Sequence, residues 1–244
     1  MLSTYFENMA RTQRLVDIFG ETGKVLTLIQ GFENMPVVSL EKAVEPLVNV
    51  VPNIKRMAYF AKEKCQSSSP DKLTLDESAS IIIYTMEWDP HEQSLYFMLN
   101  ATLPQENRQQ LKPWFLYLKL VFTALSHLPS QRVCVYRGVN DNLKERYTKG
   151  TIVVWWVFSS CTACIEVLEN EAFLQKEGKR TIFNIKSDSA KDIQRYSQFD
   201  NEDEILLLPG RVSKVMGYLQ NSDGLCTIQL KEIKPPHPYI NMLG

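Results

Sequence analysis

The sequence lacks the signals that direct a chain into or onto a membrane. Its longest uncharged stretch, residues 150–165, contains Ser, Thr and Cys and is shorter than the roughly 20 residues that a membrane-spanning helix needs. Residues 1–19 show no basic segment followed by an apolar core, and residues 235–244 lack the apolar tail of a lipid-anchor signal. We therefore expect a cytoplasmic protein, or a secreted one whose leader is missing from this sequence.

The chain also lacks a large excess of positive or negative charge. The 27 Lys and Arg residues and the 28 Asp and Glu residues leave a net charge of −1, without any long basic run. This balance gives no general attraction to nucleic acid or to an anionic membrane surface. The five cysteines are odd in number and irregularly spaced, which argues against a disulfide framework and predicts reduced thiols.

Metal-binding and phosphate-binding motifs are absent too. The sequence contains neither a P-loop nor a G-x-G-x-x-G dinucleotide-binding loop. His91, His127 and His237 are scattered, and Cys161 with Cys164 has no second pair that could complete a tetrahedral zinc site. We therefore expect no metal.

The first half of the chain has the pattern of helices. Thr74 and Glu77 have capping-box spacing, which predicts that a helix begins there. Apolar side chains recur at spacings of four and three over residues 111–125, with Pro113 near the start, and predict one buried helical stripe. Shorter helices are expected at 39–50 and 52–65.

After Pro129 the pattern changes to strands. Alternating or β-branched segments at 132–139, 151–160, 181–187 and 204–208 predict four of them, and two more flank a hairpin turn at Asp223-Gly224. We therefore predict an α+β fold with a helical lobe at residues 1–130 and a β-rich core at residues 131–244, joined as one compact unit.

Arg137 interrupts an apolar strand face. Val133, Val135 and Arg137 point to the same side of their strand, because strand side chains alternate. A buried guanidinium requires an anion, and its planar fork suits phosphate or carboxylate, while Gly138 lets a ligand approach the backbone closely. On its own, this pattern more often indicates a structural Arg–Asp or Arg–Glu ion pair than a ligand site.

Two further polar features end or begin apolar strands. Ser160 closes the aromatic segment 151–160, which alone would be an ordinary strand end. Glu202 and Glu204, two residues apart at the start of the next apolar run, would share one strand face at a separation of roughly 7 Å, where mutual repulsion can make one of them a base. The simpler interpretation is a solvated strand end.

In this order, the three features resemble the mono-ADP-ribosyltransferases of the R-S-E class, which include vertebrate ecto-enzymes and arginine-modifying bacterial toxins. Residues 73–233 are similar, block after block, to the eukaryotic arginine-specific branch. The diphtheria-toxin and poly-ADP-ribose polymerase branch would place a His at position 137, and its absence excludes that branch. The resemblance implies a β-sandwich core with the helical lobe packed on it.

The resemblance also implies roles for individual residues. Arg137 would hold the pyrophosphate and adenosine side of NAD, and the Gly138 backbone would bind the nicotinamide carboxamide. Ser160 would orient Glu204, which would bond the nicotinamide ribose and stabilise positive charge at C1′ as nicotinamide leaves. Glu202 would position the acceptor guanidinium and draw its proton.

Two loops and one departure from the family pattern complete the comparison. Residues 195–201 lie where the family keeps its acceptor-recognition loop, so Tyr196 or Phe199 could pack on the incoming protein. Residues 163–180 correspond to a loop over phosphate and nicotinamide, where Phe173 could stack on the nicotinamide ring. The family's Ser-Thr-Ser is here Ser-Cys-Thr, and the central Cys161 could make the site sensitive to oxidation.

The resemblance therefore implies an NAD-dependent protein-arginine mono-ADP-ribosyltransferase that acts on an acceptor protein. The charge balance predicts no nucleic-acid or membrane partner. The sequence does not determine the oligomeric state, and a monomer is one option. Two alternatives remain at this point. An NAD glycohydrolase with water as the main acceptor would use the same residues. A non-catalytic binding module would keep the fold without the reaction.

Overall fold

The computed structural model describes residues 26–65, 71–169, 174, 177–198 and 203–241, and these form two compact units. The helical unit contains the described residues of Leu26–Pro129, Ile193–Asp200 and Pro238–Gly244. The β unit contains those of Ser130–Asp192 and Asn201–His237. Thus the chain leaves the β unit after Asp192, contributes a short segment to the helical unit and then returns.

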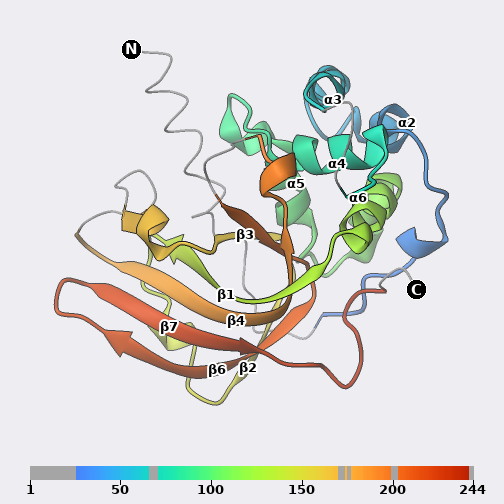
Figure 1. The fold of residues 1–244 in the computed structure, drawn as a ribbon. Coiled ribbons are helices and arrows are strands. Elements are labelled where there is room, and N and C mark those ends of the chain that lie inside the picture. The colour runs from blue at the N-terminus through green and yellow to red at the C-terminus, as the bar shows by residue number, and fades with distance from the viewer. Residues whose placement is uncertain (1–25, 66–70, 170–173, 175–176, 199–202, 242–244) are drawn as a thin grey trace, which may run out of the picture. The chain divides into compact units, whose positions relative to one another are not determined.

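Five α-helices and five short 3-10 helices form the described part of the helical unit (Figure 1). The α-helices are α2 (Leu40–Val44), α3 (Ile54–Glu63), α4 (Leu75–Thr85), α5 (Leu95–Thr102) and α6 (Phe115–His127). The 3-10 helices are η1 (Phe32–Asn34), η2 (Glu45–Leu47), η3 (His91–Gln93), η4 (Arg108–Trp114) and η7 (Gln194–Tyr196). No helix among the described residues is long and apolar enough to cross a membrane.

The start of α4 confirms the capping-box prediction. The Glu77 backbone N–H donates to Thr74 Oγ1 at 3.2 Å, and the Thr74 N–H donates to Glu77 Oε2 at 2.8 Å. These two bonds satisfy donors that have no partner within the first helical turn. Residues 77–85 that follow are all buried, so α4 is a central helix of its unit.

The single helix predicted over residues 111–125 is wrong in its first turn. Residues Arg108–Trp114 form the 3-10 helix η4 with Pro113 inside it, and α6 begins only at Phe115. Proline cannot donate a backbone hydrogen bond and its ring crowds the preceding turn, so the regular α-helix starts after it. The apolar stripe itself is present, because Leu118, Phe122 and Leu125 are buried.

Within the described residues, seven strands form the sheet of the β unit. They are β1 (Ser130–Val139), β2 (Ile152–Trp155), β3 (Ser159–Thr162), β4 (Arg180–Asp192), β5 (Glu204–Leu207), β6 (Arg211–Gln220) and β7 (Leu225–Glu232). Their order is β1-β3-β5-β4-β7-β6-β2, with an additional pairing of β1 with β4. The β4–β7 pair is parallel and the other pairs are antiparallel. Figure 1 shows β4 between β1 and β7, beside the β6–β7 hairpin. These pairings join all seven strands into one sheet. The β-sandwich that the resemblance implied therefore stays a prediction.

The long aromatic strand predicted over residues 151–160 is in fact two strands with different neighbours. β2 lies at the edge of the sheet beside β6, whereas β3 lies between β1 and β5. Trp156, Val157 and Phe158 connect them and are buried. An apolar run does not reveal which strands flank it, so the break between β2 and β3 was not visible in the pattern.

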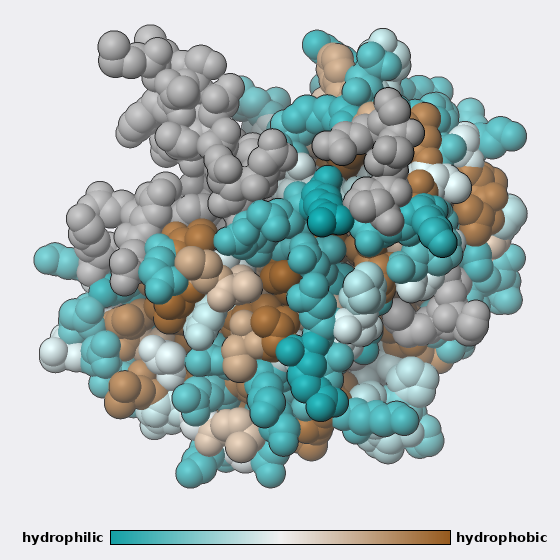
Figure 2. Space-filling view, viewed as in Figure 1, coloured by the Kyte–Doolittle hydropathy of each residue, from teal (hydrophilic) through white to brown (hydrophobic). Residues whose placement is uncertain are grey.

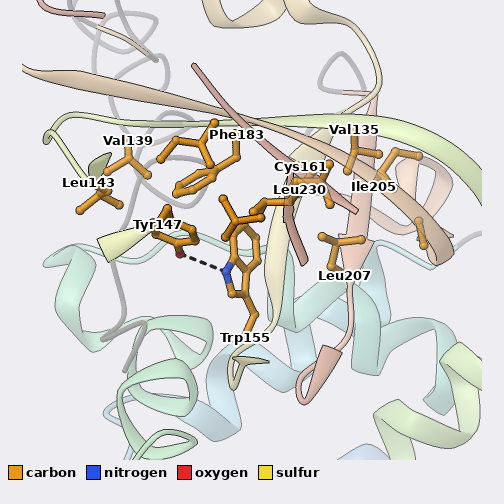
Figure 3. Close-up of a cluster of buried hydrophobic side chains, with 14 of the residues drawn as sticks. Val135, Val139, Leu143, Tyr147, Trp155, Cys161, Phe183, Ile205, Leu207 and Leu230 are labelled. Atoms are coloured by element: carbon orange, nitrogen blue, oxygen red, sulfur yellow. Dashed lines mark hydrogen bonds between the residues drawn. The ribbon is translucent and has the colours of Figure 1, made fainter. Parts of the chain in front are cut away.

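One buried apolar cluster supports the sheet. Figure 3 shows Tyr147, Trp155 and Phe183 packed together within it, and Trp155 Nε1 donates to the Tyr147 hydroxyl at 3.1 Å. The ring of Trp155 meets Phe183 edge-on, with centroids 5.3 Å apart. Strands β1, β3 and β5 each contribute side chains to this cluster, so their polar residues are carried on a rigid support.

The outer surface is mixed in character. Among the coloured residues of the face seen in Figure 2, polar side chains prevail, with smaller apolar areas between them. Large apolar side chains that are exposed include Tyr59 on α3, Ile152 on β2 and Leu219 on β6. Apolar atoms normally contribute a large share of a soluble protein's surface, so scattered exposed residues of this kind identify no binding site by themselves.

Candidate active site

Arg137 lies near the end of β1, on the strand face that turns toward the apolar cluster. Its Cα partner on β4 is Phe183, and the flanking Val135 and Val139 belong to the cluster, as the predicted alternation requires. The residue is only 4% exposed. Its guanidinium Nη1 donates to the Ser160 carbonyl oxygen at 2.7 Å, so Arg137 ties β1 to the strand that carries the next candidate residue.

The pairing of β3 with β5 brings Ser160 and Glu204 to one face. Thr162 lies directly opposite Glu204, and Ser160 lies opposite Leu206. Residues two apart on a strand share a face, and so do directly opposed residues on neighbouring strands, whose Cβ atoms are roughly 5 Å apart. Ser160, Thr162 and Glu204 therefore project to the same side of these strands, and the role of Ser160 in orienting Glu204 stays a prediction.

This polar face is buried. Glu204 is 0% exposed, and Ser160 and Thr162 are also inaccessible. The Ser160 hydroxyl oxygen has no hydrogen-bond partner among the described residues. An unsatisfied buried hydroxyl costs free energy in the absence of a partner, so the site retains a hydrogen-bonding group that a polar ligand could use.

The predicted shared face of Glu202 and Glu204 does not follow from the structure. Strand β5 begins at Glu204, and Asp203 before it has a φ of 42°, in the left-handed region. Because side chains alternate regularly only in extended backbone, the strand argument stops at Glu204. Glu202 itself lies outside the described residues, so its role stays a prediction.

Cys161 sits between Ser160 and Thr162 but faces the apolar cluster. Its side chain is 0% exposed, and its Sγ lies 3.6 Å from the Ser159 carbonyl oxygen. Burial raises the pKa of this thiol to about 12, with a smaller raising effect from Glu204 and a lowering effect from Arg137. Thiolate is the reactive form, so burial argues against the oxidation sensitivity that the sequence suggested.

Gly138 is covered by two leucines that sequence reasoning missed. A Cβ atom at this position would lie 2.8 Å from Leu174 Cδ1 and 3.5 Å from Leu168 Cδ2. Leu168 belongs to the 3-10 helix η6 (Ile165–Glu169) and packs with Tyr136 and Ile182. The segment after β3 thus covers Gly138 through apolar contacts, and Phe173 lies outside the described residues.

Tyr196 is not available to pack on an incoming protein, contrary to the expectation from the sequence. Its ring is only 5% exposed, and its hydroxyl donates to Asp71 Oδ2 at 2.6 Å within the helical unit. The other candidate, Phe199, lies outside the described residues. Because residues 195–201 are mostly polar, the sequence suggested that Tyr196 is exposed, and only the structure shows its hydrogen bond to the Asp71 carboxylate.

The described residues contain no group of three or more His, Cys, Asp or Glu side chains that could hold a metal ion. The two cysteines of the C-x-x-C segment differ in environment. Cys164 donates from its Sγ to Glu166 Oε2 at 2.9 Å, whereas Cys161 is enclosed in the apolar cluster.

Solved structures of two ADP-ribosyltransferases and of one bacterial effector share this fold. The toxin Vis from Vibrio splendidus, solved with agmatine, aligns over 83% of this chain and 90% of its own, with 19% identity and a TM-score of 0.54. The eukaryotic mono-ADP-ribosyltransferase ART2.2, solved as a variant with NADH, aligns over 86% and 94%, with 17% identity and a TM-score of 0.58. The type III effector XopAI from Xanthomonas axonopodis pv. citri aligns over 80% and 81%, with 16% identity and a TM-score of 0.55.

The sequence itself matches a family over most of its length. No curated protein sequence matches the chain significantly. Residues 28–236, however, match the family described as NAD:arginine ADP-ribosyltransferase. This range covers most of both units and includes all the candidate site residues from Arg137 to Glu204. The chain therefore belongs to the NAD:arginine ADP-ribosyltransferase family.

Proposed function

We propose that this protein transfers ADP-ribose from NAD to arginine side chains of acceptor proteins and releases nicotinamide. The observation that carries the proposal is the pairing of Thr162 with Glu204. It gives Glu204 a buried carboxylate on the same face as Ser160, whose hydroxyl has no hydrogen-bond partner in the described part of the chain. Family membership supplies the reaction class. The agmatine bound to Vis, an arginine analogue without the backbone carboxylate, supports a guanidinium as the acceptor.

The buried polar face suits a substrate whose reaction passes through a cation. As the bond between C1′ and nicotinamide breaks, its electron pair leaves with nicotinamide and positive charge develops at C1′. Glu204 would stabilise that charge, and a carboxylate is more effective there because the site excludes water. Ser160 would orient Glu204 with its hydroxyl, and Arg137 would hold the NAD phosphates while bracing the Ser160 carbonyl.

The acceptor step needs a second carboxylate. A guanidinium is cationic and a poor nucleophile, so a base must take a proton before nitrogen can bond to C1′. Glu202 would supply that base, and this role rests on its position two residues before Glu204. Gly138 would offer its backbone to the nicotinamide carboxamide, and its lack of a side chain suits that contact.

The test is incubation of the purified protein with NAD and agmatine, followed by mass spectrometry of the products. We expect ADP-ribosyl-agmatine from the native protein, and free ADP-ribose without that product from Glu202→Gln. Free ADP-ribose alone from the native protein would overturn the transferase assignment in favour of a glycohydrolase. Absence of nicotinamide release would instead indicate a non-catalytic module.

We also propose that the protein acts in the cytoplasm. All five cysteines are free thiols, as expected for a chain that folds in a reducing compartment. Localisation of a tagged full-length protein by fractionation would test this proposal, and recovery in the secreted fraction would contradict it.

A further inference from the structure

The outer edge of the sheet is open along the second half of β6. Strand β2 pairs with β6 only from Arg211 to Lys214. One further bond on this side joins the Val215 N–H to the Thr151 carbonyl at 2.9 Å. Beyond it, no described strand pairs with residues 216–220 on the side away from β7. This part of β6 is therefore an edge strand.

The turn between β6 and β7 determines which backbone groups point outward from this edge. The Asn221 N–H donates to the Leu225 carbonyl at 2.8 Å, so the backbone of Asn221 faces β7. The pairing continues without a register shift from Gln220 to Gly217, and backbone direction alternates along an antiparallel pair. The N–H and C=O groups of Tyr218 and Gln220 therefore point away from β7 and can pair with another strand.

The described contacts hold this edge in a defined shape. Asp223, in the turn of the hairpin, forms a salt bridge with Arg180 at the start of β4, with 2.6 Å between Oδ2 and Nη2. The Nζ of Lys144 lies over the ring of Tyr218, 4.9 Å from its centroid. An edge that is already ordered loses little conformational freedom when a strand is added, so binding to it costs less free energy.

The edge lacks two side-chain features that commonly prevent strands from pairing. Residues 215–222 include neither a charged side chain nor a proline, whereas natural edge strands are often protected by both. The exposed fractions of Met216, Tyr218 and Leu219 are 44%, 45% and 67%. An uncharged edge with exposed apolar side chains favours the addition of a further strand.

A second copy of the same strand satisfies this edge by symmetry. In an antiparallel pair with a two-fold axis at Leu219, Tyr218 of each copy lies opposite Gln220 of the other. The outward N–H and C=O groups of these residues then bond to one another. Leu219 lies opposite its own copy, at a position where facing side chains approach closely. Self-pairing places each residue near others of the same segment, and the absence of charge from residues 215–222 removes the repulsion that would oppose it.

We propose that two copies of this chain pair antiparallel through residues 216–220 of β6 and join their sheets into a homodimer. A pairing over so few residues forms an interface at the small end of the range for specific complexes, so we expect a reversible dimer with a dissociation constant in the micromolar range or above. The inference is independent of the proposed function, because Arg137, Ser160 and Glu204 lie on other strands.

Sedimentation velocity at increasing protein concentration tests the proposal. The mass of the native protein should rise from the monomer value of 28.1 kDa toward twice that value. Leu219→Lys and Leu219→Glu each place like charges opposite one another and should weaken self-association by at least about tenfold. The matched control is Tyr59→Lys, which replaces an apolar side chain of similar exposure (59%) on α3 and should associate like the native protein.

Mixing the two charged variants tests the position of the axis. An equimolar mixture of Leu219→Lys and Leu219→Glu should associate again, because opposite charges then face each other across the axis. Tyr218→Pro removes an outward N–H without removing a β6–β7 hydrogen bond and should also weaken association. Thermal unfolding of each variant verifies that the fold is retained.

Each contrary result overturns a stated part of the proposal. A native protein that keeps a mass of 28.1 kDa at every concentration would overturn the dimer. A dimer that Tyr59→Lys weakens as much as Leu219→Lys does would overturn the assignment to the β6 edge. Failure of the mixed charged variants to associate, with each variant folded, would overturn the two-fold axis at Leu219.

Discussion

The buried thiol of Cys161 leads to a quantitative prediction. Burial raises its pKa from the ordinary 9.0 to about 12. A shift of three units lowers the thiolate fraction at neutral pH by about a thousandfold, since each unit is a factor of ten. The side chain is also inaccessible, so its reactivity in the folded protein should fall at least that far.

Alkylation by iodoacetamide measures this directly. Peptide mass spectrometry should show that native Cys161 reacts about a thousandfold more slowly than Cys161 in urea. The exposed Cys134 is an internal control for reagent quality and should react in both states. Comparable labelling rates of Cys161 in the two states would refute the burial argument. So would inactivation by peroxide that Cys161→Ala abolishes.

The same shift makes stability depend on pH at the alkaline end. The pKa of Cys161 is higher in the folded than in the unfolded state, so its stabilising contribution is complete below pH 9. That contribution decreases as pH rises toward 12 and amounts to about 4 kcal/mol in all. Between pH 9 and pH 12, the free energy of unfolding of the Cys161→Ala variant should therefore decrease less than that of the native protein.

Three substitutions test other parts of the structure. Arg137→Lys keeps the positive charge but loses the planar guanidinium that donates to the Ser160 carbonyl. Urea unfolding should therefore show that the variant is about 1.5–3 kcal/mol less stable than the native protein. An unchanged midpoint of unfolding would contradict this. Thr74→Ala removes the N-cap of α4, and thermal unfolding should show a loss of about 1 kcal/mol in stability. NAD cleavage should be retained. Loss of cleavage in the folded variant would contradict a purely structural role of Thr74. In Gly138→Val, the new side chain would collide with Leu174 Cδ1 and block access of a ligand to the backbone at this position. The KM for NAD should therefore rise. An unchanged KM would contradict a contact between the Gly138 backbone and nicotinamide.

Features that depend on neighbouring residues in the chain were predictable from the sequence. The α4 cap needs only Thr74 and Glu77, and the face of Arg137 follows from strand alternation with Val135. The α+β class follows from the change in pattern after Pro129. Each of these is set by local geometry that a short window of sequence contains.

Features that depend on partners far away in sequence were not predictable. β2 and β3 are separate strands because β2 pairs with β6, whereas β3 pairs with β1 and β5. The Tyr196 hydroxyl donates to Asp71, which is distant in sequence, and the left-handed Asp203 interrupts an alternation that looked continuous through Glu204. Long-range pairing determines these features, and side-chain periodicity carries no information about it.

The most direct test of the account is the effect of Glu204→Gln on NAD cleavage and on transfer to agmatine. Asp203→Asn removes the neighbouring exposed carboxylate and is the matched control. We predict that Glu204→Gln loses both nicotinamide release and ADP-ribosyl-agmatine formation, whereas Asp203→Asn keeps both. Full activity of a folded Glu204→Gln variant would contradict the assignment of this buried carboxylate as the catalytic residue.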